Sequence, residues 1–211
     1  MLTDIHTHKK GIDNHIYILN LKPEDANFKA LSREAGLFST GIHPWDINKF
    51  LDSGLKEIEN CISDKRFVAV GECGFDKNIN VLFENQKDVF LKQVTLSEKY
   101  KKPVIIHCVG YFNELIEIKK KIRPSQLWII HGFRGKPELA SQLLREGFKL
   151  SFGVKFNTKS VEITDLESLY IETDESKSSI FDIYSKIANI KMCNIEQLNA
   201  GFKLVKSIIE E

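Results

Sequence analysis

The sequence has few of the features that mark secreted, membrane-bound or strongly nucleic-acid-attracting proteins. Its four cysteines are scattered without a C-x-x-C pair, which predicts free thiols in a reducing compartment. The 30 basic and 29 acidic residues leave a net charge of +1, so any polyanion must be held by local groups. No apolar run approaches membrane-spanning length, and no signal-peptide pattern opens the sequence. We therefore expect a cytoplasmic protein without membrane association.

The composition predicts an ordinary globular domain with a sizeable core. Of the 211 residues, 42% are hydrophobic and 28% are charged. No stretch resembles a linker, an internal repeat or a low-complexity tract. We therefore expect one domain that covers residues 1–211.

Short apolar, β-branched runs alternate with longer helical patterns along the sequence. Eight strands that alternate with helices are typical of an α/β fold, here a compact (β/α)8 TIM barrel. A doubly wound open sheet is the alternative, because alternation alone does not distinguish the two. Strands are expected at 1–5, 15–21, 37–42, 66–71, 103–106, 127–130, 148–152 and 169–172. Helices are expected at 24–35, 53–62, 83–100, 111–121, 136–146, 178–190 and 195–209.

Histidines and carboxylates gather at the ends of the expected strands. In the run Asp4-Ile5-His6-Thr7-His8, strand alternation places His6 and His8 on one side, as a pair of metal ligands. The carboxyl ends of the strands in a parallel barrel share one face, which carries the catalytic residues. The residues expected on this face are His6, His8, His43, Glu72, His107, His131 and Asp174.

This set of side chains predicts a centre with two divalent metal ions. It exceeds what one tetrahedral zinc ion needs, and it suits two ions bridged by a carboxylate and a water. Glu72 is the expected bridge, and Asp174 is placed to take the proton of the attacking water. The predicted reaction is hydrolysis of a polarised ester, amide or phosphodiester. We assign one ion to His6, His8 and Asp174 and the other to His107 and His131.

Several motifs, in their order and spacing, resemble the TatD family of metal-dependent hydrolases, deoxyribonucleases with an amidohydrolase-like barrel. They are Asp4-Ile5-His6-Thr7-His8, Gly41-Ile42-His43-Pro44-Trp45, Gly71-Glu72-Cys73-Gly74-Phe75-Asp76, the helix 86–96, Pro103-Val104-Ile105-Ile106-His107, His131-Gly132-Phe133-Arg134-Gly135 and Glu172-Thr173-Asp174.

The resemblance implies a divalent-metal-dependent nuclease that removes nucleotides from the 3′ ends of DNA, commonly with magnesium. It leaves His43 outside the ligand set, as a contact to substrate phosphate or an acid. Zinc, magnesium and manganese all remain candidates for the two ions, because histidine and carboxylate ligands accept each of them. The implied ligands are His6, His8, Glu72, His107, His131 and Asp174, in agreement with the strand ends.

The sequence departs from the family pattern near the expected substrate rather than at the ligands. Val109 stands where an arginine is usual, and Ser176 stands where a proline is usual. Arg134 is the first candidate for a phosphate contact, because a guanidinium binds phosphate through two parallel hydrogen bonds. Further candidates are Lys9, Lys10, Lys77 and Lys155 for phosphate, and Trp45, Phe75 and Tyr111 for stacking on bases.

Three functions follow from these observations. The leading hypothesis is a two-metal phosphodiesterase that acts on DNA ends or another phosphodiester, without an obligate protein partner. The alternative is an amidohydrolase-like hydrolase of a small ester, amide or phosphoester, which the near-zero charge and Val109 fit. The third is a barrel that has lost catalysis and serves as a scaffold.

Overall fold

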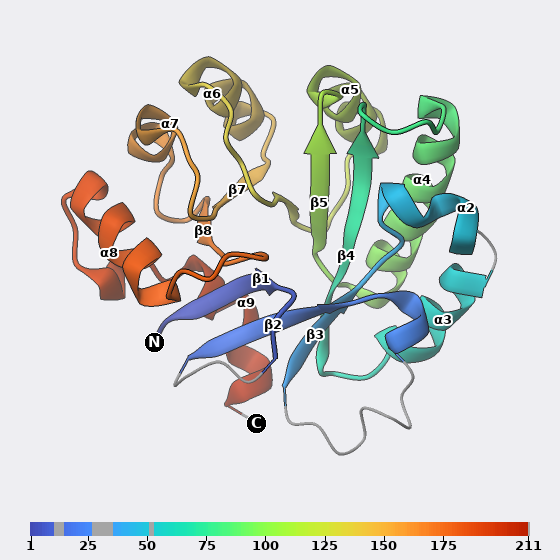
Figure 1. The fold of residues 1–211 in the computed structure, drawn as a ribbon, viewed down its shortest axis with the longest axis horizontal. Coiled ribbons are helices and arrows are strands. Elements are labelled where there is room, and N and C mark those ends of the chain that lie inside the picture. The colour runs from blue at the N-terminus through green and yellow to red at the C-terminus, as the bar shows by residue number, and fades with distance from the viewer. Residues whose placement is uncertain (11–14, 27–35, 51–52, 211) are drawn as a thin grey trace. The chain divides into compact units, whose positions relative to one another are not determined.

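The protein has a β/α topology with consecutive parallel strands. The computed structural model describes residues 1–10, 15–26, 36–50 and 53–210 (Figure 1). In this part of the chain the sheet has eight strands in the order β1 to β8, as predicted. The strands are β1 Thr3–Thr7, β2 Ile16–Leu21, β3 Leu37–Thr40, β4 Phe67–Asp76, β5 Val104–Val109, β6 Trp128–Ile130, β7 Lys149–Phe152 and β8 Leu169–Ile171.

Helices follow most of the strands, as a (β/α)8 barrel requires. They are α2 Ile47–Phe50, α3 Ser53–Ile62, α4 Phe83–Tyr100, α5 Phe112–Ile122, α6 Pro137–Arg145, α7 Thr158–Ile163, α8 Ile180–Lys191 and α9 Ala200–Ile209. Single 3-10 turns lie at η1 Pro23–Asp25, η2 Pro44–Asp46 and η3 Ile195–Gln197. The expected helix 24–35 falls mostly outside the described residues. None of the described helices is long and apolar enough to cross a membrane.

The pairing of β1 with the segment after β8 distinguishes the barrel from an open sheet. Thr7 forms a parallel bridge with Asp174, three residues beyond the end of β8. The Asp174 N–H donates to the His6 carbonyl at 3.0 Å. The first strand therefore meets the chain that leaves the last strand, and the doubly wound alternative is wrong.

The chain divides into two compact units. The first unit comprises Met1–Leu19 and Ile129–Glu211, and the second comprises Asn20–Trp128. The expectation of a single domain stays a prediction.

In the first unit, α9 packs on β1 and β8 through its buried residues Ala200, Gly201 and Val205. The predicted helix 195–209 is interrupted, because Leu198, at φ −82° and ψ 66°, leaves the helical region between the single turn η3 and α9.

In the second unit, β4 and β5 lie side by side and are longer than predicted (Figure 1). The ten residues of β4 are all buried, so Glu72 lies inside this strand and not after it. The expected strand end at Gly71 is wrong because Gly71 and Gly74, at φ 139° and 140°, keep the ladder going in a conformation that suits glycine. In that register Gly74 pairs with His107, which lies within β5.

Candidate metal centres

The first unit contains a group of histidines and carboxylates, here called the first cluster: His6, His8, His131, Glu172 and Asp174. The Oδ1 atom of Asp174 lies 3.9 Å from His6 Nε2 and 3.6 Å from His8 Nε2. Ligand bonds of about 2.0–2.2 Å place the donor atoms of one ion roughly 3–4 Å apart. The His6, His8 and Asp174 donors therefore have the spacing and the chemistry for one divalent ion.

The backbone fixes Asp174 against β1. Asp174 has a left-handed conformation with φ 54°, which aspartate tolerates better than most residues. Its N–H donates to the His6 carbonyl, and its carbonyl accepts from the His8 N–H at 3.4 Å. These two hydrogen bonds flank Thr7, so the alternation of β1 directs both imidazoles toward the same carboxylate.

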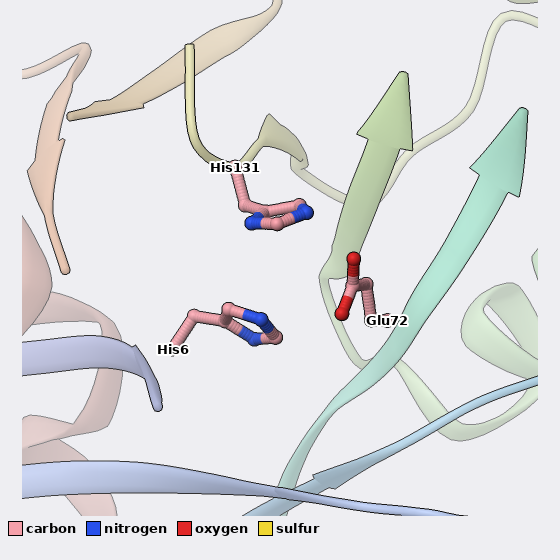
Figure 2. A group of neighbouring side chains, drawn as sticks. All are labelled: His6, Glu72 and His131. Atoms are coloured by element: carbon pink, nitrogen blue, oxygen red, sulfur yellow. The ribbon is translucent and has the colours of Figure 1, made fainter. Parts of the chain in front are cut away.

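His131 follows β6 and is oriented by the buried carboxylate of Glu172. Its Nδ1 atom lies 3.3 Å from Glu172 Oε1, which also accepts the Gly132 N–H at 2.7 Å. An imidazole that donates Nδ1–H to a carboxylate carries its lone pair on Nε2, as in many metal-binding histidines. Figure 2 shows the His131 and His6 rings, whose centroids lie 4.5 Å apart.

The sequence analysis did not assign two carboxylates in this region, Glu172 of the first cluster and Asp4 beside it. Burial by itself would raise the pKa of Glu172, but His131, His6 and Ser151 hold that pKa below its usual value. Burial raises the pKa of Asp4 to about 7. Their spacing in the sequence could have indicated both carboxylates, because residues two apart on a strand lie on the same side. Glu172 stands two residues before Asp174, and Asp4 stands two residues before His6.

Asp4 ties β1 to the segment that follows β8. Its carboxylate accepts hydrogen bonds from the Thr173 hydroxyl at 2.5 Å, from the Thr173 N–H at 3.0 Å and from the His6 N–H at 3.3 Å. All three groups lie next to or within the first cluster. Asp4 is therefore a positioning residue for His6 and Asp174.

The second unit contains the second cluster: His43, Glu72, Asp76 and His107. The Oε1 atom of Glu72 lies 2.8 Å from His107 Nδ1 and 3.3 Å from His43 Nε2. Glu72, labelled in Figure 2, is nearly buried, and its backbone N–H donates to Asn20 Oδ1 at 2.8 Å. One carboxylate oxygen thus faces two imidazoles, and Glu72 and His107 could contribute to holding an ion.

Within the second cluster, His43 differs from a metal ligand in its hydrogen bonds. The Trp45 backbone N–H donates to His43 Nδ1 at 3.2 Å. This bond uses the Nδ1 lone pair and assigns the proton to Nε2, which faces Glu72 Oε1. His43 therefore has the arrangement of a proton donor rather than of a ligand.

Asp76 is a second-cluster carboxylate that sequence reasoning did not assign. It stands four residues after Glu72 on β4, and its Oδ2 atom lies 3.4 Å from His107 Nε2. Burial would raise the pKa of Asp76, but hydrogen bonds from the Asn78 N–H and the Trp45 indole, together with His107, hold that pKa below its usual value. Asp76 therefore orients His107 from the side opposite Glu72.

The sequence-predicted ligands fall into both units. His6, His8 and Asp174 lie together, as one ion requires. His107 belongs to the second unit and His131 to the first. Their shared ion, and the bridging role of Glu72, stay predictions.

The predicted phosphate contacts Arg134 and Lys155 line a pocket of about 320 Å³ in the first unit. Glu172, Asp174 and Ser176 also line it, and Lys9 donates from Nζ to the Ser176 carbonyl. No ion pair of Arg134 or Lys155 is found within the described ranges. The pocket thus combines two cations with a candidate metal ligand.

The aromatic residues predicted to stack on bases have different environments. Phe75 is fully buried against Phe90 and Phe83, so that prediction is wrong for Phe75. Tyr111 is half-buried and packs against Phe83. Trp45 is 66% exposed beside the second cluster.

Comparisons with known proteins identify relatives of this chain. A family model described as TatD related DNase matches residues 6–199. A metal-dependent hydrolase of Methanocaldococcus jannaschii is 27% identical over 177 residues, which cover 75% of this chain and 69% of that protein. The 3′-5′ ssDNA/RNA exonuclease TatD of Cronobacter turicensis is 29% identical over 146 residues, or 66% of this chain and 55% of that protein.

The fold has a close structural counterpart. The crystal structure of YjjV, a TatD homolog from Escherichia coli, superposes with a TM-score of 0.79 at 21% identity, covering 92% of this chain and 85% of that chain. This likeness confirms the predicted (β/α)8 fold.

Proposed function

Because the chain belongs to the TatD-related DNase family of metal-dependent hydrolases, we propose that it hydrolyses phosphodiester bonds of DNA and removes nucleotides from 3′ ends. The observation that carries this proposal is the first cluster, in which His6, His8 and Asp174 have the spacing of one divalent ion's ligands. The name of the Cronobacter turicensis relative, a 3′-5′ exonuclease, supports the choice of substrate.

The proposed mechanism divides the work among residues of both clusters. Bound divalent ions supply Lewis-acid polarisation of the phosphate and lower the pKa of water. The Asp174 carboxylate accepts the proton of the attacking water. His43, with its proton on Nε2, contacts the phosphate or acts as the acid. His6, His8 and Asp174 would hold one ion and His107 and His131 the other, with Glu72 contributing to both.

The test uses metal-stripped protein and a 3′-labelled single-stranded oligonucleotide. We expect stepwise loss of label when magnesium, manganese or zinc is resupplied, and none without metal. His107→Ala and Glu72→Ala should both abolish the loss. If no metal restores cleavage of the oligonucleotide, the proposal is contradicted.

A second candidate function is hydrolysis of a small ester, amide or phosphoester. Val109, at the end of β5 where the family pattern has an arginine, favours it because a phosphate contact is missing there. Metal-dependent cleavage of small esters by a protein that leaves the oligonucleotide intact would favour this alternative.

The pocket lined by Arg134 and Lys155 favours a phosphate-bearing substrate. A cation without an ion-pair partner keeps its hydrogen-bond donors available for an anion, and a guanidinium offers two of them in parallel. The pocket also includes Asp174, the proposed proton acceptor. We therefore assign Arg134 to the binding of a substrate phosphate, with Lys155 as its neighbour.

Replacing Arg134 with alanine is expected to raise KM for the oligonucleotide about tenfold or more, because a charged hydrogen bond contributes roughly 1.5–3 kcal/mol. The kcat should change little, and Arg134→Lys should recover part of the affinity through its point charge. Arg145→Ala, at an exposed position at the end of α6, is the matched control. Steady-state kinetics with an unchanged KM in Arg134→Ala would exclude this role.

A further inference from the structure

Trp45 combines high exposure with a fixed position. Its side chain is 66% exposed, although tryptophan is among the side chains that gain most from burial. Its indole N–H donates to Asp76 Oδ2 at 2.8 Å, and Asp76 is itself buried. Its backbone N–H donates to His43 Nδ1 at 3.2 Å. The indole hydrogen bond therefore restrains the ring, and the backbone hydrogen bond restrains the turn that carries it, while much of the ring surface stays exposed.

The local backbone adds to this rigidity. Trp45 is the second residue of the 3-10 turn η2, which begins at the buried Pro44. Proline fixes its own φ and limits the conformations of the turn. An ordered exposed side chain has lost rotamer freedom without the apolar burial that usually offsets the loss. Such a preorganised surface binds a ligand at a lower entropic penalty than a mobile side chain does.

The Trp45 ring lies next to the imidazoles of the second cluster. Its ring centroid lies 5.0 Å from that of His43, edge to face, and 6.4 Å from that of His107. The indole edge thus reaches Asp76 beside a candidate metal ligand, while much of the ring remains accessible. A planar group bound against Trp45 would lie next to the imidazoles of this cluster.

We propose that Trp45 is the stacking platform for a nucleobase of the substrate. This inference rests on the proposed function, since it names the part of a nucleotide that the second cluster recognises beside the phosphate. Every nucleobase has a flat π-face, so a tryptophan platform accepts all four bases with little sequence preference. A base inside a duplex is already stacked on both of its faces and paired along one edge. The platform therefore selects nucleotides whose bases are unpaired, in single strands or at frayed ends.

The kinetic test compares two phosphodiesters with the same leaving group: thymidine 5′-(p-nitrophenyl phosphate) and methyl p-nitrophenyl phosphate. A stacked base contributes enough that Trp45→Ala should lower kcat/KM for the thymidine ester about tenfold or more, mainly through KM. For the methyl ester the same variant should lose clearly less, because that substrate has no base to stack and only the loss of the indole hydrogen bond to Asp76 affects it. Trp45→Phe keeps a ring and should recover part of the loss.

The control for this comparison is Phe181→Ala, which removes another exposed aromatic side chain, at the start of α8. It should leave both substrates unaffected. Equal losses on the two substrates in Trp45→Ala would overturn the inference, because Trp45 would then act only through Asp76 and His107.

A binding test separates this inference from the proposed function. The chain has two tryptophans, and Trp128 is fully buried, so collisional quenching by solutes reports mainly on Trp45. Thymidine monophosphate should quench the emission, deoxyribose 5-phosphate should not, and Trp45→Phe should lose the effect. Absence of quenching by thymidine monophosphate would overturn the stacking platform. If thymidine monophosphate quenches the emission but the protein cleaves neither ester with any metal, the stacking platform stands and the proposed function is contradicted.

Discussion

Replacing Asp174 with asparagine is expected to lower kcat for the oligonucleotide by about 10²–10⁴-fold, the usual contribution of a general base, while the protein stays folded. The variant removes the charge that faces His6 Nε2 and His8 Nε2. It should also bind less metal, because an amide oxygen is a weaker ligand than a carboxylate. Asparagine tolerates the left-handed conformation at φ 54°, so the backbone bridge to Thr7 is kept.

Three measurements check this prediction: kcat, metal content after dialysis, and the free energy of unfolding in urea. Asp165→Asn, at an exposed position before β8, is the matched control and should resemble the wild type in all three. Asp174→Ala should lose activity too, but it should also lose roughly 1 kcal/mol of stability, because alanine is strained in the left-handed region. Full metal content and normal kcat in Asp174→Asn would contradict the assigned role.

Replacing Gly74 with alanine is expected to lower the free energy of unfolding by about 3 kcal/mol or more. The backbone at Gly74 has φ 140°, which side chains rarely permit. A Cβ atom there would lie 2.1 Å from the His107 carbonyl oxygen and 3.2 Å from its carbon. Relief of this contact requires β4 and β5 to separate, which also displaces His107 from Glu72.

Urea denaturation measures the loss of stability in Gly74→Ala, and metal binding measures the displacement of His107. Gly36→Ala is the matched control, because the Phe38 ring is the one described group that its Cβ would meet, at an ordinary 3.6 Å. It should change the free energy of unfolding by less than about 1 kcal/mol. A Gly74→Ala protein as stable as this control would show that β4 and β5 are not held this closely in solution.

Local sequence patterns predicted much of the fold because each strand and helix has its own periodicity. The helix Phe83–Tyr100 was predicted to the residue, and the eight strands were placed in their order. Barrel closure was not predictable in this way, since it depends on the pairing of Thr7 with Asp174, 167 residues away in sequence. The sequence analysis ended β4 at Gly71, although the strand continues through Gly71 and Gly74. These glycines allow a close approach of β5, and that approach is a tertiary contact that local sequence does not show.

The sequence also predicted part of the first cluster. The two-residue period of a β-strand predicts that His6 and His8 lie on one side. The position of Asp174 after the last strand predicts that it lies on the same face of the barrel. Glu172 and Asp76 were missed because their significance comes from burial and from the histidines that they orient. Such carboxylates differ from surface ones only in their tertiary surroundings.

The hydrogen bonds of Asp4 have a consequence for how the protein acquires its first cluster during synthesis. Asp4 leaves the ribosome 169 residues before its partner Thr173. Until then His6 and His8 have no Asp174 to face, and contacts so distant in sequence form slowly. His6 and His8 are therefore synthesised long before Asp174, the carboxylate that completes their candidate metal site.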